Sequence, residues 1–186
     1  MRIMKRLPAP DFLKENWKKW GETYAKKTKW SGWTTYKGKR VNKLLYPILG
    51  MMTDNHCSYC DGFPIIGPDS IDHFKPKSNP EFYHLSYHWE NLYLACPHCQ
   101  FSKKERFNDL LLRPDEIEYE FQRYFKYDHI EQKVNLNPEC SIDEQKRAIF
   151  TIETFDFNNP KLKKAREISW RRWYLETTNG QQLEDF

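Results

Sequence analysis

The sequence predicts an α+β fold with a small strand-containing centre between helical flanks. Residues 71–74 and 91–95 are predicted to form two short strands, and a turn-rich loop follows the first of them. Residues 11–28, 142–157 and 160–175 instead carry apolar side chains at helical spacing. Two Cys-x-x-Cys pairs enclose the strand segments, so we expect the cysteines to tie the two ends of the centre together.

The first part of the chain predicts two helices. Over residues 11–28, Asp11 after Pro10 can cap the start, and aromatic side chains recur at near-helical spacing. These aromatic residues are Phe12, Trp17, Trp20 and Tyr24. Their stripe packs into a core or docks a protein partner, since aromatic residues also anchor interfaces. A second helix is expected over residues 38–53, with Pro47 as an irregularity within it.

Weaker patterns predict the elements that follow the second cysteine pair. Residues 100–107 are polar and basic and can begin a helix. Alternating apolar positions within residues 117–135 are consistent with a small hairpin, and Pro160 is suited to open the last helix. The expected organisation has three parts: a basic, aromatic helical extension (1–53), a stapled core (54–110) and a mixed or helical region that packs on the core or a partner (111–186).

Composition limits the class of protein. The chain has 186 residues, and 16% of them are aromatic, which is too many for a disordered protein. No apolar stretch approaches the roughly 20 residues that a membrane helix needs. The basic N-terminus is not followed by the apolar run of a secretory signal. We therefore expect a cytoplasmic protein without a membrane segment.

Positive charge is concentrated near the N-terminus. Residues 1–48 hold 13 Lys or Arg and 3 Asp or Glu, a net charge of +10, whereas the whole chain carries +4. Such segregation attracts polyanions, so we expect contact with nucleic acid or an acidic partner; the alternative is a solvated helix face. Within this segment the candidates for DNA contact are Lys26, Lys27 and Lys29. A second basic cluster comprises Lys161, Lys163, Lys164, Arg166, Arg171 and Arg172.

The cysteine pairs predict a metal site. Cys57 and Cys60 can reach one ion from a single tight turn, and Cys96 and Cys99 can complete a tetrahedral zinc site. Four sulfur ligands leave no open coordination position, so this zinc would be structural. A redox function would need a thioredoxin-like context, which the sequence lacks. Cys140 lies outside the set.

The candidate residues for chemistry are Asp72 and His73, between the two cysteine pairs. Because neighbouring residues of a strand point to opposite sides, Asp72 can face a catalytic ion while His73 faces a substrate or a water. Histidine is suited to take a proton from water near neutral pH. A divalent ion can stabilise the charge on a phosphodiester. The dipeptide alone is weak evidence, and the enclosing cysteines strengthen it.

The order Cys-x-x-Cys, Asp-His, Asn-Leu, Cys-x-x-Cys over residues 54–107 resembles the HNH endonucleases. The resemblance implies a ββα-metal core, which in many members is stapled by a four-cysteine zinc. It also implies that Asp72 binds a catalytic Mg²⁺ or Mn²⁺ and that His73 is the general base. Asn91 would hold the loop between the strands through hydrogen bonds to backbone. The residues expected to meet phosphates are Lys103 and Lys104, on the helix after the second cysteine pair.

One position departs from the pattern of this family. The third motif position is usually Asn or His, and here it is Gln100. Its amide oxygen can still bind the catalytic ion, but from a longer and less preorganised side chain. The alternative is a weakened or lost metal site. Other candidate donors are His98, within the second cysteine pair, and His84 and His88, within the insert.

The segment from Ala148 to Arg166 is similar to the tail of one HNH subfamily, which occurs in the Septu anti-phage defence system and in some retrons. That resemblance implies a DNA-cleaving effector that works with an ABC/SMC-like ATPase subunit. Three hypotheses follow: such an effector, an HNH nuclease that acts alone in restriction or mobile-element biology, and a non-catalytic zinc module that binds nucleic acid or protein. Asp72 and His73 favour the two nucleases, and Gln100 is the point against them.

Overall fold

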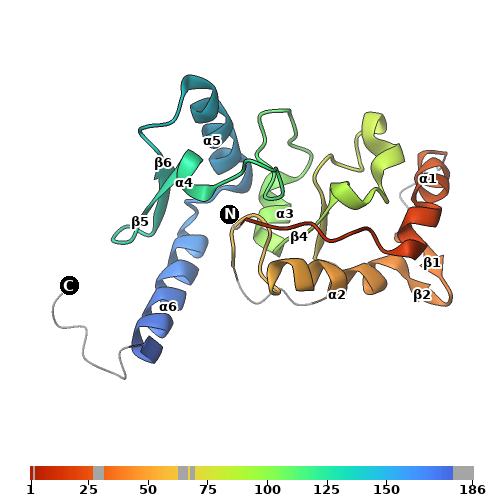
Figure 1. The fold of residues 1–186 in the computed structure, drawn as a ribbon, viewed down its shortest axis with the longest axis horizontal. Coiled ribbons are helices and arrows are strands. Elements are labelled where there is room, and N and C mark those ends of the chain that lie inside the picture. The colour runs from red at the N-terminus through yellow and green to blue at the C-terminus, as the bar shows by residue number, and fades with distance from the viewer. Residues whose placement is uncertain (2, 27–31, 63–66, 68–69, 178–186) are drawn as a thin grey trace.

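The computed structural model describes residues 1–177, except residues 2, 27–31, 63–66 and 68–69. It combines α-helices with two-stranded antiparallel sheets, which confirms the predicted α+β class. In Figure 1, β4 and α3 lie near the middle, with α1 and α2 on one side and the later elements on the other. The elements are α1 (Asp11–Ala25), β1 (Thr35–Tyr36), β2 (Lys39–Arg40), α2 (Val41–Thr53), β3 (Ile71–His73), η1 (Pro80–Leu85), η2 (Trp89–Asn91), β4 (Leu92–Leu94), α3 (Pro97–Lys103), α4 (Phe121–Tyr124), β5 (Phe125–Asp128), β6 (Lys133–Leu136), α5 (Ile142–Phe155) and α6 (Pro160–Thr177).

The centre has the order strand, strand, helix. Strands β3 and β4 pair antiparallel, with Asp72 opposite Tyr93 and His73 opposite Leu92. Helix α3 follows directly and begins at Pro97, where a proline costs no hydrogen bond, and the Cys96 sulfur accepts from the Cys99 N–H at its first turn. The helix therefore starts earlier than the expected residue 100 and ends at Lys103, with Cys96 as its capping residue and Cys99 within it.

The N-terminal helices flank this centre. Helix α1 turns its aromatic stripe towards the η1 and η2 region: Trp17 contacts His88, Trp20 contacts Tyr87, and Tyr24 contacts Tyr83, with ring centroids 4.5, 5.5 and 5.6 Å apart. The sequence left open whether these side chains pack into the core or dock a protein partner. In the structure they pack within the chain, partly buried against the core.

Helix α2 begins at Val41 rather than residue 38. The residues before it form the β1–β2 hairpin, whose turn at Lys37 and Gly38 has φ angles of 45° and 77°. Pro47 is accommodated inside α2, and Asp54 ends the helix in the left-handed conformation at φ 52°. The chain then turns directly into the first cysteine pair.

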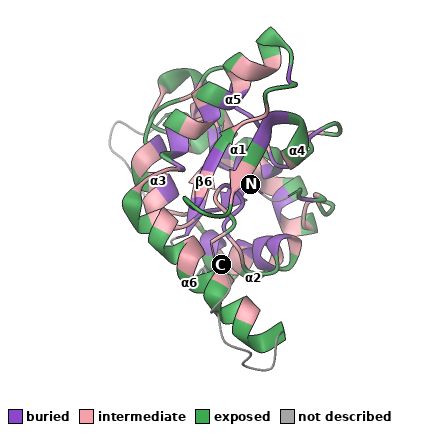
Figure 2. Cartoon of the chain, turned by 90° about the vertical axis from the view of Figure 1, so that its left-hand side faces the viewer, coloured by how far each residue is buried: buried purple, intermediate pink, exposed green. Residues whose placement is uncertain are grey.

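The C-terminal part contributes a hairpin and two helices. Strands β5 and β6 form the hairpin and extend from Phe125 to Leu136, whereas the sequence predicted a hairpin within residues 117–135. Helix α5 begins with a capping box between Ser141 and Glu144 and buries Phe155 against Tyr59, with ring centroids 4.0 Å apart. Helix α6 has no buried residue and extends away from the rest of the chain (Figures 1 and 2).

Candidate active site and metal centre

The four paired cysteines converge at one point. The Sγ atoms of Cys57, Cys60, Cys96 and Cys99 all lie within 4.8 Å of one another. The Sγ atoms of Cys60 and Cys96 are 3.7 Å apart. This separation is close to the edge of a tetrahedron, about 3.8 Å, built from metal–sulfur bonds of about 2.3 Å. The donors therefore fit a single tetrahedral ion, and the four sulfurs would leave it no open position.

The protein also stabilises negative charge on these sulfurs. The backbone N–H of Cys96 donates to Cys57 Sγ at 3.3 Å, and that of Cys99 donates to Cys96 Sγ at 3.4 Å. Hydrogen bonds from the neighbouring thiols lower the pKa of Cys96, whereas burial raises the pKa of Cys57. A divalent ion would replace these shared protons and offset part of the negative charge of the four thiolates.

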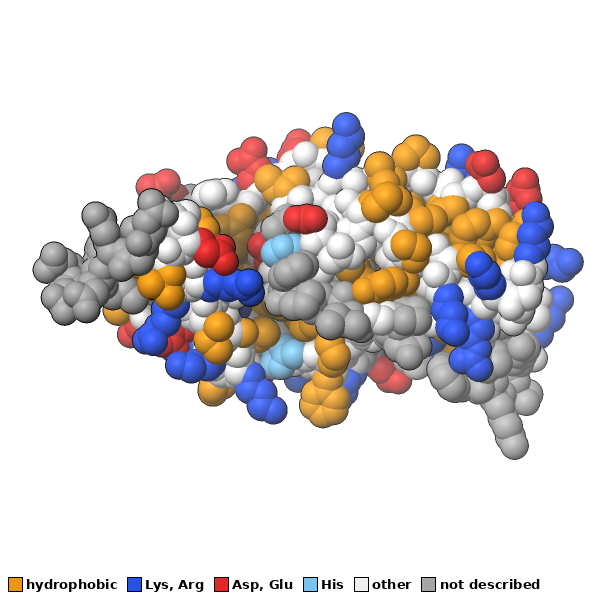
Figure 3. Space-filling model, turned by 90° about the horizontal axis from the view of Figure 1, so that it is seen from below, with side chains coloured by type: hydrophobic (Ala, Val, Ile, Leu, Met, Phe, Trp, Pro, Cys, Tyr) orange, Lys and Arg blue, Asp and Glu red, His pale blue; other side chains and the backbone are white. Residues whose placement is uncertain are grey.

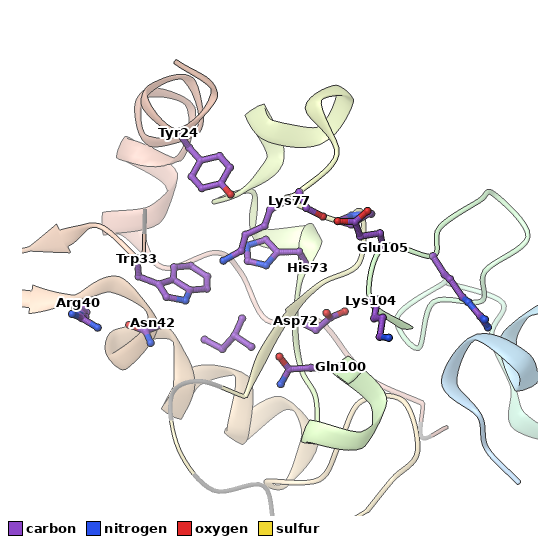
Figure 4. Close-up of a pocket in the computed structure, with 15 residues that line it drawn as sticks. Tyr24, Trp33, Arg40, Asn42, Asp72, His73, Lys77, Gln100, Lys104 and Glu105 are labelled. Atoms are coloured by element: carbon purple, nitrogen blue, oxygen red, sulfur yellow. The ribbon is translucent and has the colours of Figure 1, made fainter. Parts of the chain in front are cut away.

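Asp72 and His73 lie on β3 at the wall of a cleft of about 1090 Å³. Other side chains along its wall are Trp33, Lys77, Gln100 and Lys104, and Figure 4 shows them arranged around Asp72 and His73. The sequence pattern predicted that a carboxylate and an imidazole would serve one site, and both line the same cleft. They come from adjacent residues of one strand, so the β3–β4 pairing fixes them relative to each other.

The imidazole of His73 has a defined orientation. Its Nε2 lies 2.9 Å from the backbone carbonyl oxygen of Ser86, which can only accept, so Nε2 carries the proton. Burial and the nearby charge of Lys77 lower the pKa of His73 to about 3, although the Ser86 hydrogen bond acts in the opposite direction. His73 is therefore neutral at neutral pH, with Nδ1 as its proton acceptor.

Asp72 is held from two sides. The hydroxyl of Tyr59 donates to Asp72 Oδ2 at 2.9 Å, and the ammonium of Lys103 lies 3.2 Å from the same oxygen. The Lys103 side chain is fully buried. The expectation that Lys103 meets phosphates is therefore wrong, because its ammonium lies against Asp72 and the backbone carbonyl of His73. Tyr59 was not identified from the sequence, although it stands between Cys57 and Cys60.

Asn91 ties the segment that follows β3 to the segment that precedes β4. Its Oδ1 accepts from the backbone N–H of Lys75 at 2.7 Å, and its Nδ2 donates to the carbonyls of Lys75 and Leu85 at 3.0 and 3.1 Å. These bonds join the end of β3 to the segment before β4. They are hydrogen bonds to backbone of the kind that the sequence analysis expected at Asn91.

Gln100 lies beside Asp72 in the middle of α3, with its amide oxygen on the side of Asp72 in Figure 4. Its Nε2 donates to the Ala95 carbonyl at 2.9 Å, which sets the orientation of the amide. The alternative donor His98 instead lies 3.4 Å from the carbonyl oxygen of Asp156, at the end of α5. Neither His84 nor His88 is among the described residues that line the cleft.

The remaining basic residues differ in their positions. Lys104 is exposed and lines the cleft together with Arg40 and Arg106. Lys26 is exposed just after α1, and the expected contacts of Lys27 and Lys29 lie outside the described residues. On the face drawn in Figure 3, Lys and Arg side chains gather towards both ends, over the α1–α2 side and over α6.

The second basic cluster lies on α6 and is less available than its composition suggests. Arg166 donates to the carbonyls of Gln132 and Phe157, and is half-buried there. Three other cations of the cluster form ion pairs with glutamates of the same helix: Lys164 and Arg171 with Glu167, and Arg172 with Glu176.

Comparisons with known proteins agree with this geometry. A family model described as HNH endonuclease matches residues 57–106, which include both cysteine pairs, β3, β4 and α3. The chain is also 29% identical over 97 residues to the Septu protein PtuB of Bacillus mycoides (strain KBAB4). That match covers 46% of this chain and 31% of the relative. Within the described residues, no helix combines the length and apolar character needed to cross a membrane.

Proposed function

From the HNH endonuclease domain at residues 57–106, we propose that this chain is a divalent-metal-dependent endonuclease that hydrolyses phosphodiester bonds of DNA. The observation that carries the proposal is the pairing of Asp72 with an oriented, neutral His73 in one cleft. A module that only binds nucleic acid needs no buried imidazole of fixed tautomer that lines the same cleft as a carboxylate.

In this proposal the residues of the cleft divide the chemistry between them. His73 accepts through Nδ1 the proton of the water that attacks phosphorus, while Ser86 keeps the ring in place through Nε2. Asp72 and Gln100 hold a Mg²⁺ or Mn²⁺ by oxygen atoms, the ligands that such ions prefer. The ion, when bound, stabilises charge on the phosphodiester and its leaving oxygen. Asn91 keeps the backbone around the cleft in register.

Positive charge around the cleft supports DNA as the substrate. Lys104 and Arg106 are exposed at its rim, where phosphates on either side of the scissile bond can be neutralised. We propose that Lys26, Lys27 and Lys29 extend this contact along the duplex. The cysteine cluster, in turn, holds a structural zinc that ties β3 and β4 to the start of α3.

The Septu relative supports a role in anti-phage defence. We propose that the chain is the nuclease subunit of a cytoplasmic complex with an ABC/SMC-like ATPase, in a Septu or retron-associated system. The matched segment spans less than a third of that relative, so the alternative of a nuclease that acts alone stays open. The two are separated by whether the chain cleaves DNA without the protein encoded beside its gene.

The test is plasmid cleavage by the zinc-loaded full chain, with and without the co-purified neighbouring gene product. We expect Mn²⁺- or Mg²⁺-dependent nicking that His73→Ala and Asp72→Ala abolish, with DNA affinity close to that of the wild type. Asp72→Ala should also lower Tm, because it leaves the buried Lys103 ammonium without its carboxylate partner. His84→Ala is a matched control, because His84 is an exposed histidine away from the cleft. DNA binding without cleavage under every condition would instead support the non-catalytic zinc module.

A further inference from the structure

Asp72 contacts two side chains, one from a residue close to each cysteine pair. Tyr59 stands between Cys57 and Cys60, and its hydroxyl donates to Asp72 Oδ2 at 2.9 Å. Lys103 closes the helix that begins with the second cysteine pair, and its Nζ lies 3.2 Å from the same oxygen. Two residues that are 44 positions apart therefore meet at one carboxylate oxygen.

Both side chains are built into the core. Tyr59 and Lys103 are fully buried, and the ring of Tyr59 is stacked on Phe155. A buried ammonium is costly unless it is paired, and Lys103 finds its partners in Asp72 and in the His73 carbonyl, at 2.7 Å. Neither side chain can reach a phosphate, so their contribution to the cleft acts through Asp72 and the backbone of β3.

The two oxygens of Asp72 differ in their surroundings. Oδ2 receives the Tyr59 hydroxyl and the Lys103 ammonium. Among the residues that the structure describes, no hydrogen bond or ion pair involves Oδ1, and the carboxylate lines the cleft. A carboxylate fixed through one oxygen can rotate little, so the other oxygen keeps a constant direction.

We propose that Tyr59 and Lys103 are positioning residues that hold Asp72 Oδ2 and thereby direct Oδ1 to a divalent ion in the cleft. The cysteine cluster, through these two side chains, then sets the geometry of the ion-binding carboxylate as well as the stability of the fold. This inference rests on the proposed role of Asp72 as an ion ligand.

The experiment compares Tyr59→Phe with Tyr93→Phe in the zinc-loaded full chain. Tyr93 is the matched control, because it is also a fully buried tyrosine whose hydroxyl donates to a carboxylate, Asp115, at 2.6 Å. We measure the Mn²⁺ dissociation constant of the DNA-free protein by electron paramagnetic resonance, and kcat and KM for DNA cleavage at saturating Mn²⁺. Thermal unfolding of both variants measures the structural effect of losing a buried hydroxyl.

We expect Tyr59→Phe to weaken Mn²⁺ binding and to lower kcat by about tenfold each, with KM for DNA unchanged. Tenfold corresponds to about 1.4 kcal/mol, close to the lower end of the roughly 1.5–3 kcal/mol typical of a hydrogen bond to a charged group. Tyr93→Phe should lower Tm without changing either value. Lys103→Met should lower kcat at least as much, and the double variant should lose less than the sum, because both groups act on one oxygen.

Two results would overturn the inference and separate it from the proposed function. If Tyr59→Phe lowers Tm as Tyr93→Phe does but binds Mn²⁺ and cleaves like the wild type, Tyr59 has only a structural role. That outcome leaves the endonuclease proposal intact, provided Asp72→Ala is inactive. If Asp72→Ala itself binds Mn²⁺ and cleaves normally, Asp72 is not a ligand of the catalytic ion. The positioning role of Tyr59 and Lys103, which depends on that ligand role, is then refuted as well.

Discussion

The indole ring of Trp33 lies over the imidazole ring of His73, with ring centroids 5.3 Å apart and planes inclined by 26°. Tyr87 supports the indole edge-on at 5.5 Å, and the ammonium of Lys77 lies 5.5 Å from the indole ring. The candidate base is therefore covered on one face by a residue that lies outside the segment matched by the HNH family model.

Removing this cover should make His73 chemically accessible. In Trp33→Ala, we expect diethyl pyrocarbonate to modify His73 at least several times faster than in the wild type, because the indole no longer shields the ring. Mass spectrometry of the labelled peptide measures the rate. His84, which is exposed, serves as the internal reference, and equal His73 rates in both proteins would contradict the covering role.

Cysteine substitution should separate the metal cluster from the other buried thiol. Wild type and Cys140→Ser should each contain about one zinc per chain by elemental analysis, because Cys140 is buried outside the cluster. Cys57→Ser should contain less zinc and show lower Tm and lower solubility, since a three-sulfur site binds the ion less tightly. Full zinc content and unchanged Tm in Cys57→Ser would exclude the proposed site.

Substitutions of Gln100 test whether its amide oxygen is a ligand of the catalytic ion. We expect Gln100→Ala to raise about tenfold the Mn²⁺ concentration needed for half-maximal cleavage, because one oxygen ligand is lost, a cost of about 1.4 kcal/mol. Gln100→Asn should retain or raise activity, since it keeps the amide oxygen on a shorter side chain. Metal titrations of cleavage, with DNA affinity as the control, measure both. Wild-type behaviour of Gln100→Ala would assign the ion to Asp72 and other donors.

Asp115 should stabilise the fold in a pH-dependent manner. Burial opposes its charged form, but the charge of Arg6 and hydrogen bonds from Tyr93 and Arg6 outweigh it, so the pKa of Asp115 is lowered. A lowered folded-state pKa gives stability that is present above the unfolded value of about 4 and is lost as pH falls through the folded value. The Tm difference between wild type and Asp115→Asn should be constant from about pH 8 to 5 and shrink below about pH 4. A difference that instead grows in acid would contradict this sign.

Gly21 should be intolerant of any side chain. A Cβ at this position of α1 would lie 2.2 Å from the backbone carbonyl oxygen of His84, which cannot rotate away. We expect Gly21→Ala to destabilise the chain by about 1–3 kcal/mol through displacement of α1 from η1, measured by urea unfolding. Gly32→Ala is the matched control, since nothing lies within 4 Å of its added Cβ. Equal stability of both variants would refute the close approach.

Local spacing explains what could be predicted from the sequence. The order and spacing of one motif predicted the cysteine pairs, Asp72, His73 and Asn91. The structure brings these residues together in the central β3–β4–α3 unit. The burial of Lys103 could not be foreseen, because its partners, Asp72 and the His73 carbonyl, are distant in sequence and a lysine on a short helix is usually solvated. Trp33 was missed for the same reason, since its contact with His73 depends on how the N-terminal segment folds back.

Arg6 has a consequence for how the protein can be divided. Its guanidinium donates to Asp115 and to the carbonyls of Trp89 and Leu92, and lies over the ring of Tyr93. One side chain near the N-terminus thus joins the segment after α3 to the strand that carries half of the central sheet. A fragment trimmed to residues 57–106 would lack both Arg6 and Asp115 and would expose the apolar faces that they cover. We therefore expect that the segment matched by the family model does not fold on its own, and that expression of this isolated segment yields aggregated protein.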